Sequence, residues 1–426
     1  MFFDRFDPSD NDPRHLVGRD RDRRWLRELL SRYLGLEGPP TGRAVCISGE
    51  KGVGKSILTR SVLEELRADH SSRTLFLAVD CRSCHERRGV LAAVANAIVR
   101  ELDSLRRATA DVPGPLLANA QLLSTIARFD DVSLQVAHEQ VRQYKVATEL
   151  SGGRNQLGVL KLQFGLSLEL TEKQVQSLSG AVRFDDQGLL DALDALFRDI
   201  RGQGLDVVLY LDNIDELRHE YRTDELREKV RRDVEGILSL TRSPIALVLN
   251  VRTYYSGVVP REIGNRRVLR PLPADALCRI LEQRVVGERD DVRAAFADPV
   301  TQGVVQQLAA CAPTALAFLR WVKFLFEDDL LTPELLNEGF ETFLESYYAS
   351  VEVDALRAVA KAFPAPHHLV PRETVLDACE RNQAIFDQMQ DRQVVLPGDF
   401  WNPTRFALDP EMHFLHPATC LMVDGS

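Results

Sequence analysis

Long apolar runs are absent from the sequence: no stretch approaches the roughly 18 residues that a membrane-spanning helix needs. The N-terminus lacks the charged-then-apolar pattern of a secretory signal. The seven cysteines are odd in number and scattered through apolar segments, which argues against a disulfide framework. Internal repeats and low-complexity tracts are also missing. We therefore expect a cytoplasmic globular protein with no membrane partner.

The sequence has fewer basic than acidic residues: 53 lysines and arginines against 63 aspartates and glutamates, which gives a net charge of −10. Such a chain is not, as a whole, suited to neutralising the phosphates of a nucleic acid, although one face of it can still be basic. Apolar residues make up 45% and charged residues 27% of the 426 positions, as in ordinary globular proteins. The length indicates two or three domains.

Nearly all-apolar segments alternate with helical patterns in the first part of the chain. Strands that are buried on both faces read as continuous apolar runs, so the pattern predicts an α/β fold with a parallel sheet covered by helices. The predicted strands are 44–48, 74–80, 207–211 and 245–251. The predicted helices between and before them include 25–34, 56–66 and 89–105.

Between the second and third predicted strands lies more chain than one crossover helix requires, and we expect an insertion at about 113–182. Within it, apolar residues alternate strictly with other residues over 160–170, which predicts a β-hairpin flanked by helices. The apolar face of this hairpin either packs on the core or forms a surface for a partner or a second subunit.

The last part of the chain is mostly helical. Its final segment gives three helices followed by two short strands, which is the outline of a winged helix. We predict four parts: an N-terminal segment and helix at 1–42, a core at 43–272 that contains the insertion, a helical lid at 273–347 and a winged-helix domain at 348–426.

One segment fits the pattern G-x-x-x-x-G-K-[ST] and lies between a predicted strand and a predicted helix, as phosphate binding requires. Its glycines let backbone N–H groups wrap the phosphates, and the helix N-terminus adds its positive dipole end. Lys55 is expected to reach the β- and γ-phosphates, and the Ser56 hydroxyl to hold Mg²⁺. We therefore expect ATP and Mg²⁺ as cofactors. The segment consists of Gly49, Glu50, Lys51, Gly52, Val53, Gly54, Lys55 and Ser56.

The predicted strand at 207–211 ends in Asp212, which places a carboxylate at the sheet edge beside the phosphate loop, where it can hold the Mg²⁺ shell. The next position is Asn213, where many such ATPases carry the acid that orients the attacking water. Asp215 or Glu216 can orient the water instead. The alternative is that they are acids of the kind favoured at the start of a helix, with no catalytic role. Slow hydrolysis follows from the missing acid, and it suits a switch better than a motor.

With these two motifs the chain resembles the AAA+ and STAND group of P-loop ATPases, on the side that includes origin-recognition initiators. The resemblance implies a P-loop core, a helical lid and a winged helix, and it implies roles for residues outside the two motifs. Leu16, Val17, Gly18 and Arg19 are similar to the segment that holds the adenine, or they are a plain loop before a helix.

Further residues fall where the group places catalytic or lid elements. Asn250 and Arg252 lie at the end of the predicted strand 245–251, where the group has its sensor-1 polar residue. The alternative is that they only complete the hydrogen bonds at the end of the strand. Arg266 or Arg267 falls where the group has an arginine finger that acts on a neighbouring subunit, or both belong to a solvated basic turn. Pro313 is similar to a degenerate lid motif.

The chain departs from the group at two places. No arginine stands beside Pro313 at the usual sensor-2 place, which puts lid-coupled hydrolysis in doubt. The insertion has no counterpart in the minimal core of the group, so the resemblance says nothing of its role.

The predicted winged helix is acidic. Residues 351–426 hold six basic groups against eleven acids, and the would-be recognition helix at 381–392 carries Asp387 and Asp391 and no lysine. Since phosphate contacts supply much of the affinity for DNA, nucleic-acid binding is possible but not favoured. A protein contact or an autoinhibitory role is favoured instead.

We therefore predict an ATP-binding, slowly hydrolysing switch that changes conformation with the nucleotide, assembles into a homo-oligomer and signals to an effector protein. The resemblance implies bacterial antiphage defence as its setting. The alternative is a DNA-acting initiator or a transposition-type AAA+ ATPase.

Overall fold

A computed structural model gives the fold of the chain. The residues that it describes are 7–8, 12–34, 43–70, 73–84, 89–109, 112–128, 131–133, 181–183, 186–216, 224–253, 259, 263–326, 336–398 and 404–416. Among the helices of these segments, none combines the length and the apolarity needed to cross a membrane.

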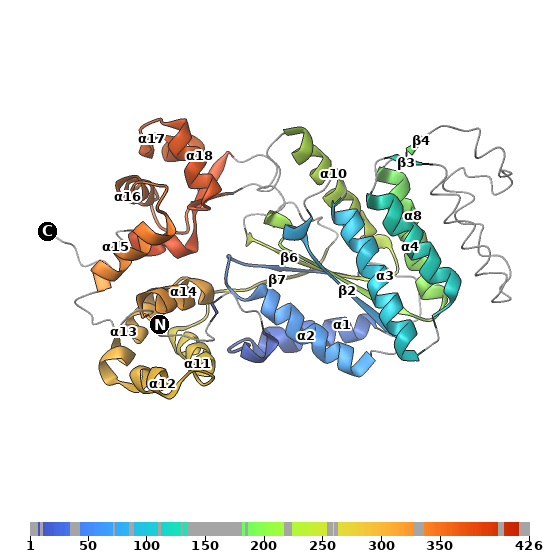
Figure 1. The fold of residues 1–426 in the computed structure, drawn as a ribbon, viewed down its shortest axis with the longest axis horizontal. Helices are drawn as coiled ribbons and strands as arrows, with labels where there is room; N and C mark the ends of the chain where they lie inside the picture. The colour runs from blue at the N-terminus through green and yellow to red at the C-terminus, as the bar shows by residue number, and fades with distance from the viewer. Residues whose placement is uncertain are drawn as a thin grey trace.

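A five-stranded parallel sheet forms the centre of the first half of the chain (Figure 1). The order is β2-β5-β6-β1-β7, so the strand before the phosphate loop lies between β6 and β7. The strands are β1 Ala44–Ser48, β2 Thr74–Asp80, β5 Asp206–Asp212, β6 Ala246–Val251 and β7 Asn265–Val268. The predicted α/β fold with a parallel sheet is confirmed, and β7 is an edge strand that the apolar pattern did not reveal.

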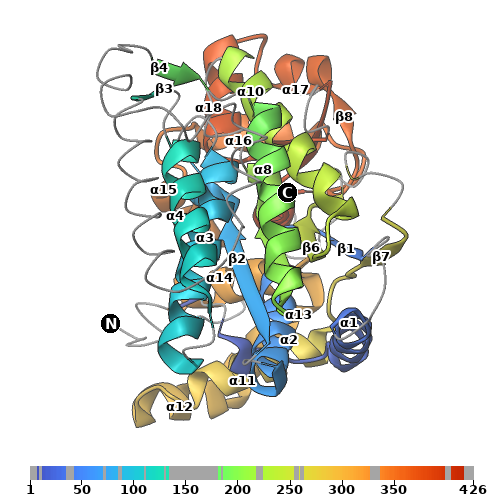
Figure 2. The same cartoon turned by 90° about the vertical axis from the view of Figure 1, so that its right-hand side faces the viewer.

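Helices cover both faces of this sheet (Figures 1 and 2). Alternate side chains of a strand enter different cores: Cys46 and Leu209 face one layer of helices, and Val45 and Tyr210 face the other. The first layer contains α3 Gly89–Thr109, α4 Gly114–Arg128, α8 Asp186–Gly202 and α10 Asp224–Ser239. The second contains α1 Asp20–Tyr33 and α2 Lys55–His70.

The insertion begins as part of the core. Helix α4 buries apolar side chains against the first layer, so this stretch extends the core and is not an appended loop. After it, strand β3 Asp131–Ser133 pairs antiparallel with β4 Ala181–Arg183. The predicted hairpin at 160–170 lies outside the described residues.

The second half of the chain forms a helical lid and a C-terminal domain (Figure 1). The lid is defined here as α11 Ala274–Val285, α12 Asp290–Ala297, α13 Pro299–Cys311, α14 Ala315–Leu325 and α15 Leu336–Tyr347. The C-terminal domain is defined as the described residues from 353 to 415. It has the helices α16 Val353–Lys361, α17 Arg372–Ala378 and α18 Gln383–Asp391, the strands β8 Val370–Pro371, β9 Val395–Pro397 and β10 Arg405–Leu408, and the 3₁₀ helix η7 Pro410–Leu415. Its strands form an antiparallel sheet in the order β8-β10-β9.

One hydrophobic core joins the lid to the C-terminal domain. Phe414 of η7 stacks on Phe340 of α15 with 4.4 Å between ring centroids. Trp321 of α14 meets both rings edge-on at 5.7 Å, and its indole N–H donates to the backbone carbonyl of Glu411 at 3.2 Å. Buried aromatic contacts of this kind resist separation, so these two parts behave as one packed unit.

Candidate nucleotide-binding site

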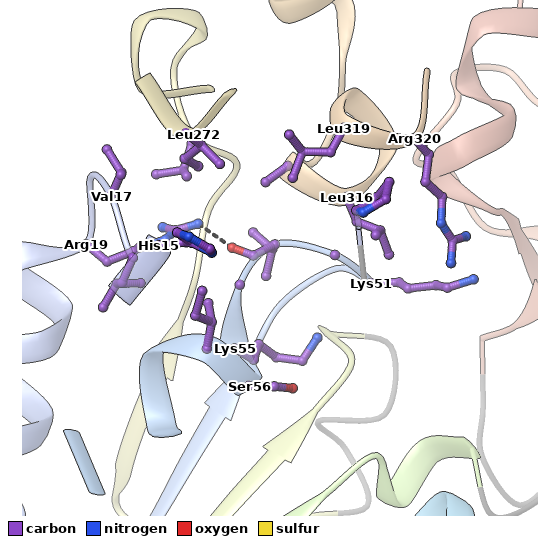
Figure 3. Close-up of a pocket in the computed structure, with 18 of the residues that line it drawn as sticks. His15, Val17, Arg19, Lys51, Lys55, Ser56, Leu272, Leu316, Leu319 and Arg320 are labelled. Carbon is purple, nitrogen blue, oxygen red and sulfur yellow. Dashed lines mark hydrogen bonds between the residues drawn. The ribbon is translucent and has the colours of Figure 1, made fainter. Parts of the chain in front are cut away.

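An open cavity of about 320 Å³ lies at the carboxyl edge of the sheet, under the lid (Figure 3). The loops after β1, β2, β5 and β6 all contribute to it, because the carboxyl ends of parallel strands meet at one edge. Its size and mixed lining suit a small polar ligand. Most of its lining comes from the loop Gly49–Ser56, the segment before α1, and the helices α11 and α14.

The amine of Lys55 lies inside the predicted phosphate loop. Its Nζ donates to the carbonyls of Gly49 and Glu50, both at 2.9 Å. Burial lowers the pKa of Lys55 to about 8, against the opposing charges of Asp215 and Asp212. An anion at this position would favour the charged amine, so the loop has the donors and the cation that phosphates need.

Gly52 sits at the point where the lid touches the loop. Its φ is +78°, and a Cβ atom there would lie 2.4 Å from the Cβ of Leu316 on α14. The backbone N–H of Leu316 donates to the carbonyl of Gly52 at 3.3 Å. Only glycine permits both this conformation and this close approach. The lid therefore contacts the phosphate loop directly.

Asp212 is buried at the end of β5 and meets the requirements of a metal ligand. Its Oδ1 accepts from the Ser56 hydroxyl at 3.0 Å and from the Asn250 amide at 3.3 Å. Its Oδ2 is buried and accepts no hydrogen bond from any described residue. A free carboxylate oxygen beside a hydroxyl is the kind of donor set that Mg²⁺ takes, with phosphate oxygens completing the shell. Ser56 and Asp212 would hold the ion, which would neutralise phosphate charge.

Asn250 lies behind Asp212 and does not line the cavity. Its amide nitrogen also donates to the Tyr210 hydroxyl at 2.7 Å, and its oxygen accepts from the Thr59 hydroxyl at 3.2 Å. With these three partners, Asn250 orients the Asp212 carboxylate. Asn250 lies at the end of β6, as predicted, and its side chain contacts Asp212, the residue predicted to hold the metal.

Asp215 and Arg252 form a buried ion pair at the cavity wall, with 2.6 Å between Nε and Oδ2. Asp215 was predicted as a substitute for the missing acid at 213. Because the guanidinium holds its carboxylate in this ion pair, Asp215 is already committed to a partner inside the protein. The side chain of Glu216, the other predicted acid, lies outside the described residues.

Arg266 and Arg267 lie on the edge strand β7 and do not line the cavity of their own chain. Arg266 donates to the backbone carbonyls of Ile263 and Val259 at 2.9 and 3.0 Å. Arg267 donates to Asp22 at 2.7 Å and lies over the ring of Trp25. A role in a neighbouring subunit's site stays a prediction for both.

The predicted adenine segment forms one side of the cavity, where Figure 3 shows His15, Val17 and Arg19 together. Leu16 also lines it, and Gly18 makes a turn with a φ of +71°. The buried guanidinium of Arg19 donates to the carbonyls of Val53 and Arg270, both at 2.7 Å. This side chain therefore braces the phosphate loop against the segment that leads to the lid.

The lid contributes α14 to the cavity, but Pro313 itself is not part of the lining. Thr314 begins the helix by accepting from the N–H of Ala317 at 3.3 Å. Further along, Arg320 lines the cavity although sequence analysis found no arginine beside Pro313. Helical spacing from Leu316 would have found it, because residues four apart share a helix face.

Lys51 makes a contact that the sequence did not reveal. Figure 3 shows its amine and the guanidinium of Arg320 on the same side of the cavity. The Nζ of Lys51 lies 3.2 Å from Oδ2 of Asp409 and 3.6 Å from Oε1 of Glu411, both in the C-terminal domain. Arg320 pairs with the same Glu411 carboxylate. Two acids of the last described segment thus hold two cations of the site.

Comparison with known proteins adds a family and several similar folds. The family model described as AAA ATPase domain matches residues 15–233. No curated protein matches the chain. The ORC1 protein of Aeropyrum pernix in complex with DNA is similar at 16% identity and a TM-score of 0.45, over 92% of this chain and 90% of that one. The ADP form of the ORC2 protein of Aeropyrum pernix is similar at 14% identity and a TM-score of 0.45, over 96% of this chain and 95% of that one. Cdc6p from Pyrobaculum aerophilum is similar at 14% identity and a TM-score of 0.43, over 96% of this chain and 95% of that one.

The stretch matched by the family model is more than half of the chain, and it runs from the segment before α1 through the phosphate loop to Asp212 and beyond. The parallel sheet, the loop around Lys55 and the pairing of Ser56 with Asp212 are the parts that an ATP-binding core of this family requires. The chain belongs to the AAA ATPase domain family of P-loop proteins.

Proposed function

We propose that the chain is a slow ATPase that works as a conformational switch, in which ATP and Mg²⁺ release the C-terminal domain from the phosphate loop. One observation carries the proposal: Lys51 of the loop is held by Asp409 and Glu411. Both carboxylates are almost fully buried, with 2% and 5% of their side chains exposed.

Competition between anions supports this mechanism. The triphosphate of ATP is an anion that enters the cavity lined by Lys51 and Arg320. These cations already hold Asp409 and Glu411, and a buried carboxylate that loses its partner is costly. Bound phosphate therefore weakens the contact between the loop and η7, and the acids regain water when the domain moves away.

The moving body is the lid together with the C-terminal domain, because the two share a core. Among the described residues, it contacts the phosphate loop through the ion pairs of Lys51 with Asp409 and Glu411 and through the backbone hydrogen bond from Leu316 to Gly52. A ligand can shift such an equilibrium only by binding one arrangement better than the other, and the acids that it displaces provide that difference.

Slow hydrolysis is supported by the carboxylates around the cavity. Asp212 has its free oxygen where the metal would bind, and Asp215 is held by Arg252. Asn213 replaces the usual acid. Each of these two carboxylates therefore has another role, and an amide takes no proton from water, so turnover depends on the orientation of the water alone.

Hydrogen exchange with ATP·Mg²⁺ tests the switch. We expect faster exchange in the segment 404–416 when ATP is bound, and unchanged exchange in Lys55→Ala, which should no longer retain nucleotide. Lys361→Ala, an exposed lysine on α16, is the matched control and should respond like the unaltered chain. Bound ATP without any change in the segment 404–416 would refute the switch.

We also propose that ATP promotes self-assembly, with Arg266 or Arg267 acting on the nucleotide of a neighbouring copy. Both lie on an edge strand away from the cavity of their own chain, which fits such a role. Sedimentation with and without ATP measures assembly. Arg266→Ala and Arg267→Ala should lower turnover in the assembled state only, and equal turnover at all protein concentrations would count against the idea.

The partner of the switch is the remaining question. The sequence favoured an effector protein, with antiphage defence as the setting, over a DNA-acting initiator. The solved structures compared above are ORC and Cdc6 proteins, and the ORC1 protein of Aeropyrum pernix is in complex with DNA. We therefore propose DNA action as the first setting to test.

The charge of α18 makes that test discriminating. This helix carries Asp387 and Asp391 and no basic residue. Arg381 before it is paired with Asp377. Anisotropy with duplex DNA at several salt concentrations, with and without ATP, decides between the settings. Binding that weakens steeply with salt supports DNA action, and ATP-dependent assembly without DNA binding supports the effector protein.

A further inference from the structure

Asp80 is a carboxylate at the sheet edge that the sequence did not single out. It ends β2, directly opposite Asp212 in the neighbouring strand β5. The side-chain nitrogen Nδ2 of Asn213, the residue after Asp212, donates to Oδ1 of Asp80 at 2.9 Å. The acid missing at position 213 is therefore present on the adjacent strand, bonded to the amide that replaces it.

The carboxylate of Asp80 is fixed in place. Arg82 donates to it through its backbone N–H at 3.1 Å and through Nη2 at 2.8 Å. Burial favours a raised pKa, but the hydrogen bonds from Arg82 and Asn213 outweigh it and lower the pKa of Asp80. The group is therefore ionised at neutral pH, and an ionised carboxylate accepts hydrogen bonds and donates none.

This charge decides the orientation of Asn213. An amide has one donating and one accepting end, and only the donating NH₂ can face Asp80. Asn213 lines the cavity, and its Oδ1 accepts no hydrogen bond from the described residues. Its backbone is also held, with a φ of +56° and an N–H that donates to Asp212 at 3.1 Å. The oxygen is thus presented on the side away from Asp80.

We propose that Asp80 is a positioning residue for ATP hydrolysis, which fixes the Asn213 amide so that its oxygen accepts a hydrogen bond from the attacking water. The inference rests on the ATPase function proposed above. The water oxygen forms a bond to the γ-phosphorus while the bond from that phosphorus to the β,γ-bridging oxygen breaks. ADP leaves with the bridging oxygen, and both protons of the water remain on the released phosphate as H₂PO₄⁻. Asn213 orients the water and takes no proton, because an amide oxygen is too weakly basic.

Exchanging the two side chains tests the pair. Asp80→Asn leaves an amide facing an amide, which no longer fixes the orientation of Asn213, and we expect kcat to fall about tenfold with ATP affinity unchanged. Asn213→Ala should lose on the order of a hundredfold. The double variant D80N/N213D restores a hydrogen bond from an amide to a carboxylate. The amide is now at position 80, and the carboxylate at position 213 faces the water. Its kcat should exceed that of the unaltered chain and of N213D, and its pH–rate profile should gain an acid limb.

Controls separate this inference from the proposed function. Asp103→Asn removes an exposed acid on α3 that pairs with Arg107, and it should leave turnover unchanged. ATP binding is measured for each variant by calorimetry. If the unaltered chain does not bind ATP, the proposed function is refuted. ATP binding without any hydrolysis would refute both the ATPase function and the role of Asp80. An unaltered kcat in Asp80→Asn, or a double variant no faster than N213D, would overturn the role of Asp80 alone. If Asp80→Asn does not fold, the double variant, which keeps the hydrogen bond, still decides the matter.

Discussion

Lys51 of the phosphate loop and Asp409 of the C-terminal domain are joined by a hydrogen bond of 3.2 Å, although 358 positions separate them in the sequence. Lys51 also donates to Gln393 at 3.0 Å, which lies just before β9. The loop that binds phosphates is therefore in direct contact with the domain farthest from it along the chain. In the proposed switch, this contact couples the nucleotide site to the C-terminal domain.

Removing the amine of Lys51 should loosen this contact. In Lys51→Met, Asp409 and Glu411 lose a partner while still buried, at a cost of roughly 1–3 kcal/mol in the free energy of unfolding. Thermal unfolding without nucleotide measures the loss, and hydrogen exchange in 404–416 should already be fast before ATP is added. Lys361→Met is the control, and an equal loss in both variants would mean that the Lys51 contact contributes nothing.

ATP affinity should depend on pH through Lys55. Burial lowers the pKa of Lys55 to about 8, so the amine of the free protein is charged below that pH and neutral above it. Bound phosphate favours the charged form, and binding above pH 8 must take up a proton. Affinity should therefore hold steady up to about pH 8 and then fall by up to about tenfold per pH unit.

Calorimetry from pH 7 to 9.5 in buffers of different ionisation enthalpy measures both the affinity and the proton uptake. The γ-phosphate has lost its own proton well below this range. Lys51→Met should keep the same dependence, because this variant leaves Lys55 and its burial unchanged. A constant affinity over the whole range would contradict the assignment to Lys55.

The carboxylate of Asp212 should set the response to Mg²⁺. In Asp212→Asn the amide is a weaker ligand, so Mg²⁺ should add little to ATP affinity and hydrolysis should be lost. Titration of ATP with and without Mg²⁺ gives the difference. Asp103→Asn serves as the control and should keep the full effect of the metal. An undiminished Mg²⁺ effect in Asp212→Asn would place the ion elsewhere.

A methyl group at position 52 should separate the lid from the loop. In Gly52→Ala the new Cβ would overlap Leu316, and the φ of +78° adds backbone strain. We expect a loss of about 1–3 kcal/mol in unfolding free energy, or a lid displaced in the nucleotide-free protein. Gly303→Ala, on α13 with no atom near its added Cβ, is the matched control. Equal stability of the two variants would show that the close contact is unimportant.

Much of the core was predictable because its signals are local. The phosphate loop has a fixed spacing, and β1, β2, β5 and β6 are apolar over most of their length. β7 escaped notice because Asn265–Val268 is short and polar, as suits an edge strand that alternately faces solvent. Local sequence patterns therefore predicted the four buried strands of the parallel sheet but not β7, its partly exposed edge strand.

The site was predictable only where a residue acts through its place in a motif. The structure places the Ser56 hydroxyl beside Asp212 and the Lys55 amine inside the loop, while the roles predicted for them stay predictions. Lys51 and Asp80 owe their roles to partners from other elements, and no spacing rule links those partners. The sequence also predicts that Asn213→Glu speeds turnover. In the structure this change sets two carboxylates side by side, so the gain should require Asp80→Asn as well.

The antiparallel pairing of β3 with β4 has a consequence for how the chain can vary. The ends of the segment 134–180 are held side by side by Asp131–Ser133 and Ala181–Arg183. Closing a loop between adjacent ends costs little more free energy as the loop grows. The length of chain between these two strands can therefore change while the pairing of β3 with β4 stays in place.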